Sequence, residues 1–134
     1  MPNLSRLSLL GIVLSAVLLA GCAPAKVRNV TDSPVRSNKS PVTMQDVSGA
    51  IKHAGAGLGW AMLDSGPGKI DGTLRLRTHV AEVEVSYDTS KYSIQYKNSV
   101  NLDYDAEKGT IHKNYNGWIQ NLDNAIQREL ANLS

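Results

Sequence analysis

Three basic side chains alternate along one short stretch, Arg75-x-Arg77-x-His79. In a continuous β-strand, alternate residues share a face and lie about 7 Å apart, so this spacing predicts a basic row on one face of a sheet. Such a row could bind a phosphate, a carboxylate or an acidic glycan, because arginine makes bidentate contacts with these groups. The interpretation that we favour is a solvent-facing row that forms cross-strand ion pairs. The acidic residues available for this are Glu82, Glu84 and Asp88.

A second cluster of polar and aromatic residues contains His112, Tyr115 and Asn116. If His112 met His79 in space, two imidazoles with a nearby aspartate could hold a metal or relay a proton, as in a small hydrolase. The aspartates in question are Asp103 and Asp105. Neither histidine has a helical H-x-x-x-H partner, and a zinc site held by protein normally needs three or four ligands.

The same cluster also fits a structural role, which we favour. His112 or Asn114 can cap a following helix, while Tyr115 and Trp118 enter the core. The stretch Asp103-x-Asp105-x-Glu107 does not fit a calcium loop, because a lysine stands where that loop requires glycine. No G-x-S-x-G, C-x-x-C or H-E-x-x-H motif occurs, so we expect no cofactor and no bound metal, and no enzyme class is indicated.

The one cysteine of the chain, Cys22, follows an apolar run from Leu7 to Leu19. A run of about 13 residues suits a signal peptide, because a membrane-spanning helix needs roughly 18 to 20. A thiolate is also nucleophilic enough to accept a lipid. The stretch Leu19-Ala20-Gly21-Cys22 resembles the lipobox of bacterial lipoproteins.

This resemblance implies cleavage between Gly21 and Cys22, a diacylglycerol on the thiol of Cys22 and an acyl chain such as palmitate on the new amine. Two or three acyl chains hold a protein firmly on a membrane, since each buried CH₂ contributes about 0.8 kcal/mol. Because Ala23 stands where an aspartate would retain a lipoprotein at the inner membrane, the resemblance implies the periplasmic side of the outer membrane.

Periodicity and composition indicate the helices, strands and linkers on which these residues lie. Residues 1–21 are expected to be a signal peptide, and residues 22–42, with three prolines and little apolar pattern, a lipidated flexible tether. Thr43 and Asp46 predict a capped helix over about 44–55, followed by a glycine-rich stop. Period-two alternation predicts strands between 60 and 104, and an apolar stripe from Tyr115 to Leu133 predicts a final amphipathic helix.

We therefore expect a single α+β domain over residues 43–134, a two-layer sandwich. Its antiparallel sheet of about four strands is covered by a short N-terminal helix and a C-terminal amphipathic helix.

With 14 basic and 12 acidic residues and a formal net charge of +2, nothing indicates nucleic-acid binding.

The expected function is that of a membrane-anchored periplasmic lipoprotein acting as a non-enzymatic binding or envelope-assembly accessory module. Its partner would be a protein or another envelope component, and the globular part resembles small proteobacterial envelope lipoproteins. Two alternatives stay open at this point: an enzyme that uses His79 and His112, and an inhibitor that blocks an envelope enzyme with Arg75, Arg77 and His79.

Overall fold

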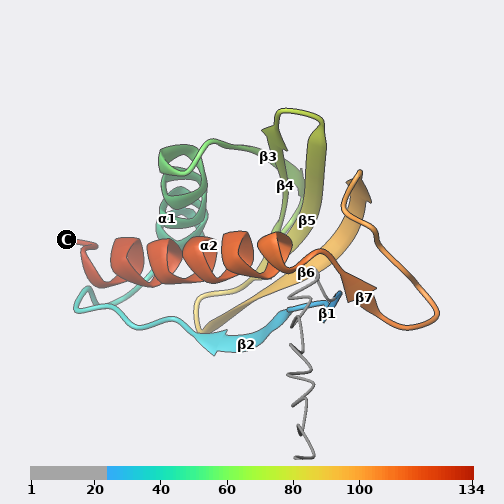
Figure 1. Ribbon diagram of the computed structural model, residues 1–134. Coiled ribbons are helices and arrows are strands. Elements are labelled where there is room, and N and C mark those ends of the chain that lie inside the picture. The colour runs from blue at the N-terminus through green and yellow to red at the C-terminus, as the bar shows by residue number, and fades with distance from the viewer. Residues whose placement is uncertain (1–23) are drawn as a thin grey trace, which may run out of the picture.

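A computed structural model describes residues 24–134 of the chain; the expected signal peptide and Cys22 lie outside the described residues. In chain order the elements are β1 (Ala25–Lys26), β2 (Val30–Pro34), α1 (Met44–Gly57), β3 (Trp60–Gly66), β4 (Lys69–Leu76), β5 (His79–Tyr87), β6 (Lys91–Val100), β7 (Thr110–Ile111) and α2 (Lys113–Ala131). Five strands form an antiparallel sheet in the order β2-β6-β5-β4-β3, and β1 pairs with β7 separately. Figure 1 shows α2 crossing the strands, with α1 beside it. The predicted α+β class is confirmed.

Helix α1 begins where its capping residues predict. The hydroxyl of Thr43 accepts a hydrogen bond from the backbone N–H of Asp46, and the carboxylate of Asp46 accepts one from the N–H of Thr43. These reciprocal bonds satisfy two N–H groups that a helix start leaves without intrahelical partners. The helix runs two residues past the predicted end and stops before Gly59, which has φ of 86°.

The alternation of the strands has the expected physical basis. Ile70 and Leu74 of β4 and Val83 and Val85 of β5 are buried, while Asp71, Thr73 and Glu84, at the alternate positions, are more exposed. The apolar positions change from even numbers up to Leu74 to odd numbers from Ala81 on. A tight turn causes this change, because β4 ends at Leu76 and β5 begins at His79. These strands therefore place one apolar face toward the helices and leave the other face open.

A bulge in β6 changes which face its last residues occupy. The register shifts between the pairs Glu82–Asn98 and Val83–Tyr96, so Lys97 is the extra residue. Unbroken period-two alternation would place Tyr96 and Val100 on the same face. Beyond the bulge, however, Val100 is 52% exposed and lies opposite Val80.

Helix α2 closes the core from one side of the sheet. Its buried stripe includes Tyr115, Ile119, Leu122 and Ile126, which form one cluster with residues of α1 and the inner face of the strands. The cap is the side chain of His112, which accepts from the N–H of Asn114 at 3.1 Å. The prediction of His112 as the capping residue is therefore confirmed, and the alternative, Asn114, is wrong.

The prediction of a flexible tether over residues 22–42 is wrong for the part that forms β1 and β2. Val30 is buried and pairs with Ile94, and the side chain of Asn29 accepts from the N–H of Tyr96 at 2.9 Å. A proline ends β2 without loss of sheet pairing because β2 is an edge strand. The larger sheet consequently has five strands, close to the predicted number of about four, and the folded unit begins before residue 43.

Candidate functional site

The predicted basic row does not exist on one face of the sheet. Arg75 lies opposite Val80 in the β4–β5 pair, whereas His79 lies opposite Leu76. Cross-strand partners share a face and successive residues alternate, so Arg75 and His79 lie on opposite faces. Arg77 is in the turn between the strands, with φ of 55°. The prediction is wrong because a turn, and not a continuous strand, joins these residues. An inhibitor acting through one face formed by all three therefore has no support.

The expected cross-strand ion pairs of the two arginines are absent from residues 24–134 as well. Glu84 is instead 3.7 Å from the Nζ of Lys69, and the neighbouring Asp71 is 2.6 Å from the Nζ of Lys97. Lysines thus take the role that we expected of Arg75 and Arg77. Both arginines are exposed near the tip of the β4–β5 hairpin.

The two histidines make separate hydrogen bonds. Nδ1 of His79 is 2.7 Å from the carbonyl oxygen of Asn101, and Nδ1 of His112 caps α2. His112 also lines a cavity of about 170 Å³ with Asp103 and Asp105, but His79 does not line it. Within the described part of the chain, no three His, Cys, Asp or Glu side chains are grouped to hold a metal ion. Both imidazoles therefore fit structural roles.

Tyr115 and Asn116 connect α2 to the rest of the fold. Tyr115 is fully buried with the ring of Tyr96 edge-on at 5.7 Å, and burial raises the pKa of its hydroxyl. The side chain of Asn116 accepts from the N–H of Arg28 at 2.9 Å and donates to the carbonyl oxygen of Lys26 at 2.7 Å. Asn116 thus holds the segment around β1 against α2, which is a structural role.

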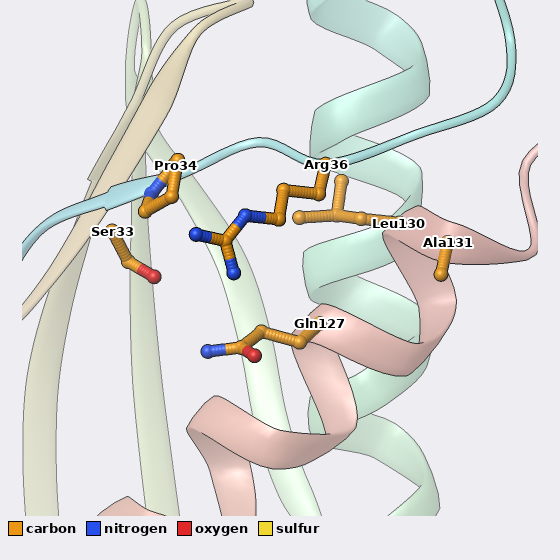
Figure 2. Close-up of a pocket in the computed structure, with 6 residues that line it drawn as sticks. All are labelled: Ser33, Pro34, Arg36, Gln127, Leu130 and Ala131. Atoms are coloured by element: carbon orange, nitrogen blue, oxygen red, sulfur yellow. The ribbon is translucent and has the colours of Figure 1, made fainter.

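A different set of residues lines a cavity of about 200 Å³ between the chain that follows β2 and the last turns of α2. It is lined by Ser33, Pro34, Arg36, Gln127, Leu130 and Ala131. Figure 2 shows the guanidinium of Arg36, the hydroxyl of Ser33 and the amide of Gln127 turned toward one another. Leu130 and Pro34 supply apolar surface beside these polar groups. We call this cavity the Arg36 pocket.

A buried pair of polar side chains lies next to the Arg36 pocket. The hydroxyl of Tyr92 donates to Oδ1 of Asp123 at 2.5 Å, and Nε2 of Gln127 donates to the same oxygen at 3.3 Å. Burial and the bond to Asp123 raise the pKa of Tyr92 to about 12, so its hydroxyl keeps its proton and remains a donor. The carboxylate of Asp123 is therefore stabilised by side chains of its own chain.

Arg36 differs from the cationic residues of the ion pairs. Among residues 24–134, its guanidinium has no hydrogen bond and no ion pair, although Arg36 lines a cavity. It also lies near the carboxyl end of α2, where the helix dipole favours a cation. An exposed guanidinium beside an apolar wall can form two parallel hydrogen bonds to a carboxylate.

Sequence reasoning missed this pocket for two reasons. Ser33 and Arg36 fall in the stretch that we expected to be a tether. Asp123, whose carboxylate accepts a hydrogen bond from the lining residue Gln127, is charged and so counts among the polar positions of the last helix. One signal was available: Asp123 follows Ile119 by four residues and precedes Ile126 by three, which places it on the apolar stripe. A carboxylate on an apolar stripe indicates a buried polar partner.

No protein-family model, curated protein or solved structure matches this chain. Of the helices in residues 24–134, neither is long and apolar enough to cross a membrane.

Proposed function

We propose that this chain is a lipid-anchored periplasmic lipoprotein of the outer membrane whose domain is a non-enzymatic binding module. The anchor rests on the likeness of Leu19–Cys22 to a lipobox, and these residues lie outside the described part of the chain. The observation that supports the binding role is the Arg36 pocket, which combines a guanidinium that is unpaired among residues 24–134 with polar and apolar walls.

The chemistry of the pocket favours a carboxylate attached to a small apolar group. Arg36 supplies donors for both carboxylate oxygens, Ser33 supplies a further donor, and Leu130 and Ala131 contact an apolar substituent. A cavity of about 200 Å³ is smaller than the roughly 300–1,000 Å³ of sites that hold drug-sized molecules. The ligand that fits is therefore the end of a larger partner, such as the carboxyl terminus of an envelope polypeptide.

The binding role can be tested by nuclear magnetic resonance with two short peptides, acetyl-Gly-Leu-Ala with a free carboxylate and the same peptide amidated. We expect only the free acid to shift the amide signals of Leu130 and Ala131, with a dissociation constant in the millimolar range, about −4 kcal/mol. Arg36→Gln should abolish the shifts. Arg75→Gln, which removes an exposed arginine far along the sequence on β4, is the matched control. Equal shifts with the amidated peptide, or none with the acid, would refute a carboxylate site.

The anchor needs a separate test. In cells fed radiolabelled palmitate, the full chain should be labelled and sediment with outer membranes, whereas Cys22→Ala should lose both properties because no other thiol is present. Labelling that persists in Cys22→Ala would contradict the anchor and would leave the pocket experiment unaffected.

A further inference from the structure

Strand β3 leaves one edge of the five-stranded sheet open. It pairs with β4 on one side, and no strand of residues 24–134 pairs with its other side. Edge strands of this kind expose N–H and C=O groups to pairing with another chain, and proteins commonly block them with proline, lysine or a bulge. The sequence of β3, Trp-Ala-Met-Leu-Asp-Ser-Gly, contains no proline, lysine or arginine.

The opposite edge of the same sheet is blocked. Strand β2 is five residues long, its register shifts between Val30 and Ser33, and Asp32 has φ of 49°. It also ends in Pro34, which has no N–H to donate. The register of β3 also shifts, between Asp64 and Gly66, but that shift lies at the hairpin end of the strand. The two edges of one sheet thus differ, and β3 presents a regular stretch for pairing over residues 60–64.

Exposed apolar surface flanks β3 on both faces of the sheet. Leu63 is 70% exposed on the open face, opposite Asp71 of β4. On the helix side, Met44 is 41% exposed and lines a groove of about 500 Å³ that reaches Asp64 and Gly66 of β3. A strand added to this edge would cover both apolar side chains.

The charges of this edge are compatible with a second copy of the same strand. Asp64 is the one charged residue of β3, and its carboxylate is 2.7 Å from the Nζ of Lys52 in the same chain. In an antiparallel pair with a two-fold axis at Met62 or Leu63, Asp64 lies opposite Trp60 or Met62 and never opposite another Asp64. The same registers place Leu63 opposite Ala61 or opposite its own copy. No like charges meet, and apolar residues meet on the open face.

We propose that two copies of this chain associate through antiparallel pairing of their β3 strands, which joins two five-stranded sheets into one continuous sheet. Two-fold dimers are the commonest closed assemblies, because one self-complementary surface serves both subunits. This proposal depends neither on the lipid anchor nor on the Arg36 pocket, which lies beside β2 at the other edge of the sheet.

The test uses the detergent-solubilised full chain and measures its mass by analytical ultracentrifugation over a concentration series. We expect a concentration-dependent dimer, and Leu63→Lys should raise its dissociation constant at least tenfold by placing two like charges near the two-fold axis. Val100→Lys is the matched control, since Val100 is also an exposed apolar strand residue but lies on β6. It should leave dimerisation unchanged.

Cysteine crosslinking locates the interface independently of affinity. Under mild oxidation, Leu63→Cys should give a disulfide-linked dimer of the chain with itself if the two-fold axis lies at Leu63, and Leu63→Cys combined with Ala61→Cys should give one if it lies at Met62. Val100→Cys should give none. Three results would overturn the proposal: a monomer at every concentration, a dimer that tolerates Leu63→Lys, or a crosslink from position 63 only to a different protein. The last result would identify β3 as an edge that accepts a foreign strand.

Discussion

At the scale of single residues, the central feature is the buried hydrogen bond between Tyr92 and Asp123. Both side chains are largely buried, and each satisfies a polar group that would otherwise be costly inside the core. Tyr92 comes from β6 and Asp123 from α2, so the bond also sets how the helix sits on the sheet. Gln127, which donates to the same carboxylate, links this pair to the Arg36 pocket.

Tyr92→Phe should lower the free energy of unfolding by about 1.5–3 kcal/mol, because a buried carboxylate loses its strongest donor. Urea unfolding followed by circular dichroism measures this change. Tyr104→Phe is the control, since Tyr104 is 42% exposed and its loss of a hydroxyl should have little effect. Equal changes in the free energy of unfolding for the two substitutions would mean that the buried hydrogen bond adds no more stability than an exposed hydroxyl does.

Asp46 provides a pH-dependent contribution at the start of α1. Hydrogen bonds from the backbone N–H of Thr43, from Lys39 and from the hydroxyl of Thr43 lower the pKa of Asp46 from 3.8 to about 2. Because the folded pKa is the lower one, its stabilisation is complete above about pH 4 and is lost as the pH falls through 2. Asp46→Asn should therefore be less stable than the natural chain at pH 6, and the difference should shrink between pH 4 and 2.

The measurement is the urea midpoint of each chain at several pH values. Glu107→Gln is the control, because Glu107 is exposed and forms no ion pair within residues 24–134. A gap between Asp46→Asn and the natural chain that is the same at pH 2 and pH 6 would show that the charge of Asp46 does not stabilise α1.

At the scale of elements, two glycines have opposite roles. Gly72 on β4 faces the core, where an added Cβ would lie 3.0 Å from Sδ of Met62 and 3.1 Å from Cγ2 of Val83. Gly49 lies within α1, where an added Cβ would meet nothing within 4 Å. The absence of a side chain therefore permits close packing at Gly72, whereas at Gly49 it only weakens the helix.

Gly72→Ala should destabilise the protein by about 1–3 kcal/mol through overpacking, whereas Gly49→Ala should stabilise it by about 0.5–1 kcal/mol through helix propensity. Thermal and urea unfolding of both variants measure the two changes, and each variant serves as the control for the other. Stabilisation by Gly72→Ala would mean that Met62 moves aside at no cost.

At the scale of the whole molecule, residues before the first helix complete the sheet. β2 covers the edge of β6, and Val30 joins the core cluster with residues from both helices. The N–H of Asp32 also donates to the hydroxyl of Ser93, a buried residue of β6. The region that connects the domain to its expected anchor is thus partly structural.

A chain beginning at residue 36 should unfold at a clearly lower urea concentration than one beginning at residue 24, because it lacks β1, β2 and the burial of Val30. Circular dichroism and urea titration of both chains provide the comparison. Val30→Ala in the longer chain should give a smaller loss, about 1 kcal/mol or somewhat more, which separates core packing from strand pairing. Identical midpoints for the two chain lengths would restore the tether interpretation.

Much of this architecture follows from local signals in the sequence. The capping box at Thr43 and Asp46, the alternation along β4 and β5 and the apolar stripe of α2 each involve residues within a few positions of one another. Such patterns depend on the geometry of one helix or strand, so they can be read without knowing what packs against it. They predicted the α+β class and both helices.

The features that join distant parts of the chain depend on contacts that form when the chain folds. β2 is a strand because β6, about 60 residues away, offers it an edge, and Asp123 is buried because Tyr92 lies opposite it. Arg75 and His79 lie on opposite faces of the sheet because a two-residue turn separates β4 from β5. Which face each residue occupies depends on how these two strands pair. The Arg36 pocket likewise exists only where β2 and α2 meet. Long-range pairing reflects a balance of packing energies over the whole core, and no local pattern contains that balance.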